Sequence, residues 1–242
     1  MSQPHSDPAN SGNGSPNGFR WMDADAYFFD IDGTLLTSRD RIHYRALNTA
    51  MKVVYGVDTT IDGVAYHGMT DLGILRAALV RVGVSGDEFL SKLPAALAVV
   101  RECVDREATT LAPQVCVAIR DVLTRLQQSK KLMGVASGNL ESVGWHKVRA
   151  AGLRDFFTSG YFADGCETRG EIFMQAATAA RKLLPPGASI CFVGDTPSDV
   201  LAARQANARV IAVATGIFTF DDLQARHPDL CLSSCAELLA SD

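Results

Sequence analysis

Short apolar segments recur along the chain and alternate with stretches of helical periodicity. Four are strongly apolar and one is weaker, and they span residues 26–29, 132–136, 189–193 and 209–213 and, more weakly, 156–161. Strands of a parallel sheet are buried on both faces, so they are typically continuous apolar runs joined by helical crossovers. The pattern therefore predicts an α/β fold with a parallel sheet covered by helices.

The helices that follow these segments carry recognisable ends. Asn139 can cap the helix after 132–136, and a second helix over 171–184 should stop at the Pro-Pro-Gly sequence 185–187. Pro197 occupies a favoured first helical position for a third helix.

Residues 40–112 differ from the rest, because they show helical periodicity and no credible strand. We expect helices over 42–55, 71–82 and 87–107, with Pro94 kinking or dividing the last one. This separate helical unit is inserted between the first and second strands. It should therefore lie over the carboxyl ends of the strands, where open α/β sheets bind ligands.

The composition excludes several classes of function. With 47% hydrophobic and 21% charged residues, the 242-residue chain is typical of globular proteins, and its net charge of −4 without a Lys/Arg cluster argues against a nucleic-acid partner. The polar N-terminus predicts a disordered tail over residues 1–23, and no segment is apolar enough to indicate a membrane protein. Six scattered cysteines indicate reduced, mostly structural thiols and a cytoplasmic protein: Cys103, Cys116, Cys166, Cys191, Cys231 and Cys235.

Two carboxylates stand where the first strand should end. In the sequence Asp-Ile-Asp-Gly-Thr, Asp30 and Asp32 are two residues apart, so both face the same side at a separation of roughly 6 to 7 Å. Such a pair tends to divide into one charged nucleophile or metal ligand and one proton carrier. Aspartate and glycine are also common in solvated turns, so this pentapeptide alone leaves both interpretations open.

Polar groups also follow two further strands. Ser137, Gly138 and Asn139 open a helix after the second strand, and a helix N-terminus of this kind can bind an anion, although these residues are also ordinary helix starters. Asp195 and Asp199 follow the strand over 189–193. Carboxylate oxygens gathered near the first strand suit Mg²⁺, whereas Asp199 alone could simply complement a helix dipole.

Together these motifs resemble the haloacid dehalogenase superfamily of phosphohydrolases, in its phosphoglycolate-phosphatase-like subfamily. Residues 30–35 resemble its first motif, 137–139 its second and 194–199 its fourth, and 68–71 with 74–75 resemble its small helical cap. The resemblance implies a Rossmann-like core with an inserted α-helical cap. The expected boundaries are a tail over 1–23, a core over 24–39 and 113–242, and a cap over 40–112.

The third motif departs from the family pattern, because no lysine stands at the expected place. Arg169 is the nearest cation, and the segment after it resembles the one that follows this motif in the family. Lys147 is the rival. It lies two turns into the helix after Asn139, where a lysine is more often a solvated charge on the helix face, so we favour Arg169.

The resemblance implies the chemistry of a Mg²⁺-dependent phosphatase acting on a small phosphorylated metabolite. Asp30 would attack phosphorus and form a phosphoaspartate, and Asp32, its pKa raised by neighbouring negative charge, would donate and then accept a proton. The remaining expected roles are metal binding by Asp30, Asp32, Asp195 and Asp199, and phosphate or substrate binding by Thr34, Thr70, Ser137, Gly138, Asn139 and Arg169.

Other classes of protein share parts of this pattern. A sugar-phosphate mutase uses the same core and cap, so the motifs do not exclude it. A non-enzymatic phosphoryl acceptor is less favoured, because it would need neither Asp32 nor a cap, and a dehalogenase would need no metal aspartates. Phosphoglycolate, sugar phosphates and nucleotides all remain possible substrates, and the sequence leaves the oligomeric state open.

Overall fold

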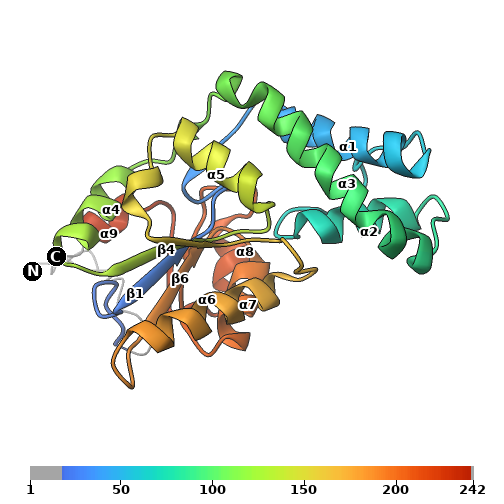
Figure 1. The fold of residues 1–242 in the computed structure, drawn as a ribbon. Coiled ribbons are helices and arrows are strands. Elements are labelled where there is room, and N and C mark those ends of the chain that lie inside the picture. The colour runs from blue at the N-terminus through green and yellow to red at the C-terminus, as the bar shows by residue number, and fades with distance from the viewer. Residues whose placement is uncertain (1–17, 241–242) are drawn as a thin grey trace, which may run out of the picture.

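The computed structural model describes residues 18–240 and is built around one six-stranded parallel sheet (Figure 1). The strands lie in the order β5-β4-β1-β6-β7-β8, with every pairing parallel. Their bounds are β1 Ala26–Phe29, β4 Leu132–Ala136, β5 Ser159–Tyr161, β6 Ile190–Gly194, β7 Arg209–Val213 and β8 Leu230–Leu232. The predicted α/β class is confirmed. The edge strand β8 was not predicted.

Helices cover both faces of the sheet because β1 sends alternate side chains into two apolar cores. Phe28 enters one core, where Phe173 stacks on Phe192 with ring centroids 4.0 Å apart, and Phe29 enters the other. The helices are α4 Ile119–Gln128, α5 Glu141–Ala150, α6 Arg169–Leu183, α7 Pro197–Gln205, α8 Phe220–Gln224 and α9 Ala236–Ala240. Helices α6 and α7 lie together on one side, and α4 and α9 lie on the other (Figure 1).

Three helices lie between β1 and α4 in the sequence and form a group beside the sheet (Figure 1). They are α1 Ile42–Tyr55, α2 Asp71–Val80 and α3 Gly86–Glu107, followed by a short 3-10 turn, η1 Ala108–Thr110. Pro94 does not divide the third helix, because α3 continues through it; the alternative, a kink at Pro94, stays a prediction. We call these helices and their connections, residues 40–112, the cap.

The two chain segments that join the cap to the sheet are paired. Strand β2 (Leu36–Thr37) and strand β3 (Gln114–Val115) form a short antiparallel ladder in which Leu36 lies opposite Val115. Backbone hydrogen bonds therefore join the segment that enters the cap to the segment that leaves it.

The predicted disordered tail over residues 1–23 is wrong for its last six residues. Phe19 and Trp21 are buried in the same core as Tyr27, and the Tyr27 hydroxyl donates a hydrogen bond to the carbonyl of Trp21. Two aromatic side chains bury enough apolar surface to hold this short segment against the sheet. Residues 1–17 lie outside the described residues.

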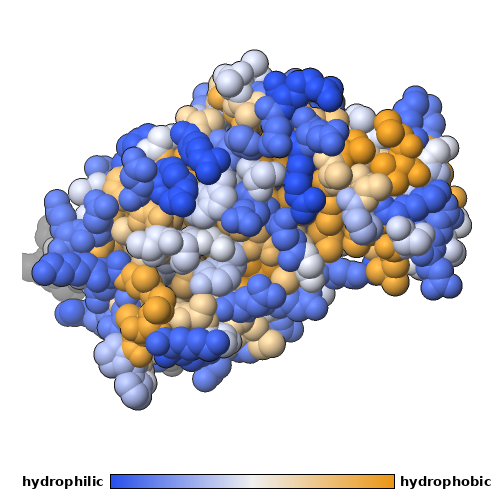
Figure 2. Space-filling model, in the orientation of Figure 1, coloured by the Kyte–Doolittle hydropathy of each residue, from blue (hydrophilic) through white to orange (hydrophobic). Residues whose placement is uncertain are grey.

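The face of the molecule in Figure 2 mixes hydrophobic and hydrophilic side chains, as expected for a globular composition. Figure 2 shows apolar patches on the cap and over the sheet domain that are separated by hydrophilic side chains. All six cysteines are free, as predicted.

Between residues 18 and 240, no helix is both long enough and apolar enough to cross a bilayer.

Candidate active site

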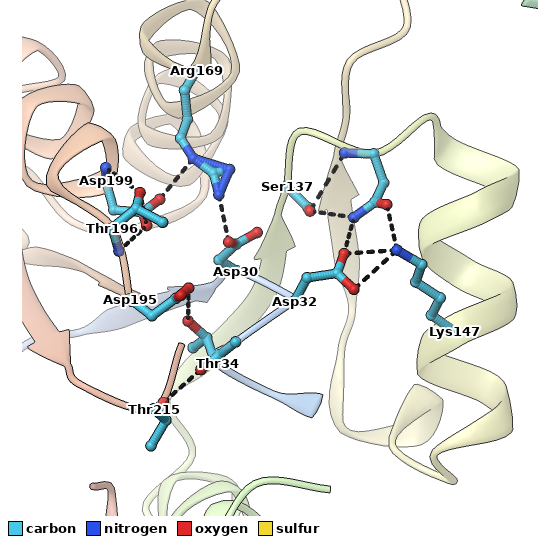
Figure 3. A network of polar contacts seen from close by, with 12 residues as sticks. Asp30, Asp32, Thr34, Ser137, Lys147, Arg169, Asp195, Thr196, Asp199 and Thr215 are labelled. Carbon is cyan, nitrogen blue, oxygen red and sulfur yellow. Dashed lines mark hydrogen bonds and ion pairs between the residues drawn. The ribbon is translucent and has the colours of Figure 1, made fainter. Parts of the chain in front are cut away.

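The carboxyl ends of three adjacent strands bring the predicted polar residues together. Asp30 follows β1, Ser137 follows β4 and Asp195 follows β6, and these strands are neighbours in the sheet. Arg169 reaches the same place from the first position of α6 (Figure 3). These residues line a cavity of about 680 Å³ between the sheet and the cap.

Three aspartates form a buried acidic cluster, and two of them, Asp30 and Asp195, line this cavity. Carboxylate oxygens of Asp30, Asp195 and Asp199 lie within 4.8 Å of one another. Burial raises the pKa of Asp30 to about 6, and burial together with the charges of Asp30 and Asp199 raises the pKa of Asp195 to about 8. Oδ1 of Asp30 is buried and has no hydrogen-bond partner among residues 18–240.

Glycines make room for the central carboxylate of this cluster. A Cβ atom at Gly33 or at Gly216 would overlap with the side chain of Asp195, and Gly33 also has a positive φ of 86°. Both positions therefore require glycine if Asp195 is to point at Asp30.

Arg169 pairs with two members of the acidic cluster. Its Nη2 donates to Oδ2 of Asp30, and its Nε lies 2.8 Å from Oδ1 of Asp199, with only 6% of its side chain exposed. Despite its burial, the carboxylates raise the pKa of Arg169 above its ordinary value. Asp199 is held in turn by the Thr196 amide and hydroxyl, at 3.0 and 2.7 Å, in a capping box at the start of α7.

Lys147 is not a solvated charge, so this part of the expectation is wrong. Its side chain is 7% exposed, and its Nζ lies 2.9 and 2.7 Å from the two carboxylate oxygens of Asp32 and 2.8 Å from Oδ1 of Asn139 (Figure 3). The sequence held a signal for this burial. Lys147 lies four residues after Val143 and one before Val148, on the apolar stripe of α5.

The expectation of a raised pKa for Asp32 is also wrong. Burial raises it, but the charge and hydrogen bonds of Lys147 and the amide of Asn139, at 2.9 Å, outweigh burial and lower the pKa of Asp32. The sequence argument considered only the neighbouring carboxylates. It missed the ammonium group that long-range folding places between Asp32 and α5.

The loop after β4 does not use its asparagine as predicted. Helix α5 has no side-chain cap, and Nδ2 of Asn139 instead donates to Oγ of Ser137 at 2.8 Å and to Asp32. The loop still lies at the amino end of α5 and lines the cavity with Ser137, Gly138 and Asn139. It therefore presents its polar groups toward Asp30 and Asp32, at a helix end that favours anions.

Two threonines that we expected to contact phosphate serve other purposes. The Thr34 hydroxyl donates to Oδ1 of Asp195 at 3.1 Å, and the Thr70 hydroxyl accepts from the Gly73 amide and donates to the Glu167 carbonyl. Neither threonine lines the cavity. Thr34 thus orients Asp195, and Thr70 caps α2.

Two cap residues near the site escaped the sequence reasoning. His43 on α1 lies with Nε2 3.0 Å from Oδ2 of Asp71 and with Nδ1 3.3 Å from Nζ of Lys147. The sequence placed Asp71 at a cap-helix start from which it could contact substrate, and His43 carried no recognised motif, so neither was among the predicted site residues. Their side chains reach the site only because α1 and the start of α2 pack over the strand ends.

Comparison with known proteins finds two relatives named as phosphatases and a solved structure with a similar fold. The chain is 26% identical to the probable phosphatase IndB of Dickeya dadantii, and the match covers 88% of this chain and 91% of that protein. It is 27% identical to a phosphoglycolate phosphatase of Synechococcus elongatus, and this match covers 88% of this chain and 95% of that protein. The crystal structure of a β-phosphoglucomutase from Clostridium difficile has a similar fold, with a TM-score of 0.65 at 18% identity over 89% of this chain and 93% of that one.

The family model of the haloacid dehalogenase-like hydrolases matches residues 24–207, which contain all the strand-end aspartates described above. The acidic cluster, the helix-start loop and the buried arginine are thus found in a chain whose sequence matches this family over most of its length. The chain belongs to the haloacid dehalogenase-like hydrolases and is an enzyme of that family.

Proposed function

We propose that this enzyme is a Mg²⁺-dependent phosphatase that hydrolyses a small phosphate monoester through a phosphoaspartate on Asp30. The observation that carries the proposal is the position of Asp30, at the end of β1, on the cavity wall and beside both Arg169 and the other two buried carboxylates. The names of the two relatives support a phosphatase. The free thiols support a reducing, cytoplasmic location.

The acidic cluster fits a divalent cation. Three buried carboxylates are unfavourable together unless cations offset their charge, and Arg169 supplies only one. The carboxylate of Asp30 still has a buried oxygen without a partner, and hard oxygen ligands suit Mg²⁺. Asp30, Asp195 and the main-chain carbonyl of Asp32 would hold the ion, with Asp199 ordering the surrounding groups. When bound, Mg²⁺ would offset charge on the phosphoryl oxygens and hold the phosphate near Asp30.

The chain's own groups then account for phosphoryl transfer. Asp30 attacks phosphorus while the guanidinium of Arg169, the Ser137 hydroxyl and the loop amides of Gly138 and Asn139 stabilise negative charge on the transferring oxygens. Cap residues such as His43 and Asp71 line one side of the cavity and would limit the water that reaches it to what the second step needs.

Asp32 moves the protons in this scheme. Lys147 and Asn139 hold it as a carboxylate in the substrate-free enzyme. A bound phosphate dianion brings negative charge beside Asp32, which raises its pKa and favours the protonated form that can donate to the leaving oxygen. After the alcohol leaves, the Asp32 carboxylate accepts a proton from the water that attacks the phosphoaspartate.

A panel of phosphate monoesters tests the proposal and separates it from a sugar-phosphate mutase, the second candidate, which the likeness to the β-phosphoglucomutase fold keeps open. With Mg²⁺ present, we expect inorganic phosphate equal to the substrate consumed, for at least one of phosphoglycolate, sugar phosphates and nucleotides. Conversion of a sugar 1-phosphate into its 6-phosphate with little free phosphate would instead identify a mutase.

Metal affinity should depend on pH, because protons and Mg²⁺ compete for the same carboxylates. In the metal-free enzyme Asp195 has a pKa of about 8 and Asp30 of about 6, so both are largely protonated below pH 6 and both are largely ionised above pH 8. We expect Mg²⁺ binding, measured by calorimetry, to weaken on the order of tenfold or more between pH 8.5 and pH 6.5. Equal affinities at the two pH values would contradict this assignment. The Asp195→Asn variant is the control and should lose most of the affinity at both.

A further inference from the structure

Asp71 holds the phosphate-binding loop from the cap side. Its backbone amide donates to the carbonyl of Gly138 at 2.8 Å, and its Oδ2 accepts from the amide of Leu140, also at 2.8 Å. Asp71 is 2% exposed and is the first residue of α2. One cap residue therefore binds two successive peptide groups of the loop that follows β4.

These two hydrogen bonds fix the direction of the loop's polar groups. In a trans peptide the carbonyl and the N–H point in opposite directions. Because the Gly138 carbonyl faces Asp71, the Asn139 N–H of the same peptide points away from the cap, toward Oγ of Ser137 at 3.5 Å. The next peptide is held at both ends, by Asp71 at the Leu140 amide and by the Ala163 amide, 2.9 Å from the Asn139 carbonyl.

The contact is too close to admit a side chain on the loop. A Cβ atom at Gly138 would overlap with the carbonyl oxygen of Met69 and would lie 3.1 Å from Cα of Thr70. The backbone of the cap at residues 69–71 is therefore packed directly on the backbone of the loop. This explains the glycine at position 138 without reference to its own dihedral angles.

His43 orients the Asp71 carboxylate and links it to the other half of the site. Its Nε2 lies 3.0 Å from Oδ2 of Asp71, and its Nδ1 lies 3.3 Å from Nζ of Lys147, which in turn contacts both oxygens of Asp32. A continuous chain of polar contacts thus runs from the phosphate-binding loop through two cap residues to Asp32.

From these contacts we propose that Asp71, oriented by His43, is a positioning residue that shapes the phosphate-binding loop when the cap is docked. The inference rests on the proposed phosphatase function. Asp71 lines the cavity, but its Oδ2 is already engaged by the Leu140 amide and by His43, so we assign it a positioning role and not a catalytic one. It fixes the loop in the form in which its amide and hydroxyl donors face the transferring phosphoryl group, so catalytic competence depends on the docked cap.

Two substitutions separate hydrogen bonding from charge and from packing. Asp71→Asn keeps, at the position of Oδ2, one oxygen that can accept from both the Leu140 amide and Nε2 of His43, and it removes the charge. Asp71→Leu keeps only the volume. We expect Asp71→Leu to lower kcat on the order of tenfold to hundredfold, less than the loss of a whole oxyanion donor, with KM changed by less than about threefold. Asp71→Asn should remain within about threefold of the wild type.

Orthovanadate supplies a readout that a purely structural role would not change. Because vanadate mimics the transition-state phosphoryl group, its inhibition constant should rise in Asp71→Leu by the same factor as kcat falls. Arg76→Met is the matched control. It breaks the ion pair between α2 and Glu167, which also joins cap and core, and it should alter KM more than kcat or vanadate binding.

Each possible result supports or contradicts the positioning role of Asp71. Unchanged kcat and vanadate inhibition in a folded Asp71→Leu enzyme would overturn the inference, as would an Asn variant as impaired as the Leu variant. If Asp71→Leu does not fold by circular dichroism, His43→Leu provides the test, since it leaves the start of α2 intact and should lower kcat several-fold. Failure of the phosphatase proposal is distinct, because the wild type would then release no phosphate from any ester.

Discussion

The Asp30→Asn enzyme should release no phosphate above background while keeping its fold. An amide cannot attack phosphorus, and loss of a catalytic nucleophile typically lowers kcat by roughly 10⁴- to 10⁶-fold. The fold should survive, because the substitution is isosteric and removes one of three buried, mutually repelling carboxylates. The measurements are phosphate release and the far-ultraviolet circular dichroism spectrum of the purified variant.

Asp32→Asn is the matched control for this prediction. It removes the proton carrier and leaves the nucleophile, so turnover should fall sharply, yet a phosphoenzyme should still accumulate from a substrate with a good leaving group. Mass spectrometry of the rapidly quenched protein would detect that adduct, and Asp30→Asn should show none. Near-normal hydrolysis by Asp30→Asn would remove Asp30 from the mechanism.

Replacement of Arg169 should give the second large effect. The guanidinium contacts Oδ2 of Asp30, where a bound phosphoryl group must approach, and its loss should cost on the order of 2 to 4 kcal/mol of transition-state stabilisation, or about 30- to 1,000-fold in kcat/KM. Arg169→Ala also leaves Asp30 and Asp199 without their buried cation. We therefore expect a lower melting temperature in the absence of Mg²⁺ and partial recovery when Mg²⁺ is added.

Lys147→Ala provides the comparison, since the structure divides the two cations between the two aspartates that we propose for catalysis. Arg169 contacts Asp30, whereas Lys147 contacts Asp32. Loss of charge stabilisation should slow all esters alike, so Arg169→Ala should be impaired with good and poor leaving groups equally. Lys147→Ala should be impaired most with poor leaving groups, which depend on a positioned Asp32. Unchanged kinetics for Arg169→Ala together with a large, uniform loss for Lys147→Ala would transfer the third-motif role to Lys147.

The local sequence was sufficient to predict the strands and helices that have a clear apolar pattern of their own. The apolar run that became β1 predicted a strand buried on both faces, and the structure shows all four of its residues buried. The separate helical periodicity of the inserted unit likewise became α1, α2 and α3. The edge strand β8 was missed because it has only three residues and two of them are only partly buried, so its apolar pattern is weak.

The sequence by itself also determined that carboxylates would gather at one edge of the sheet. Parallel strands all end at the same edge, so Asp30 and Asp195 had to meet once β1 and β6 became neighbours. Only the tertiary structure decided their environment. Burial and mutual repulsion depend on contacts between segments more than 100 residues apart, and they give these two groups raised pKa values.

The predictions that failed also concern contacts between segments that are far apart in the sequence. Lys147 lowers the pKa of Asp32 because α5 turns its apolar stripe, with the lysine on it, toward a residue 115 positions earlier. Thr70 caps α2 and does not line the cavity, while its neighbour Asp71 holds the loop after β4. Which residue types end the strands was determined locally, by strand and turn chemistry. The packing of the cap and the helices over those strand ends decided which of these side chains are paired, which are buried and which are free to meet a substrate.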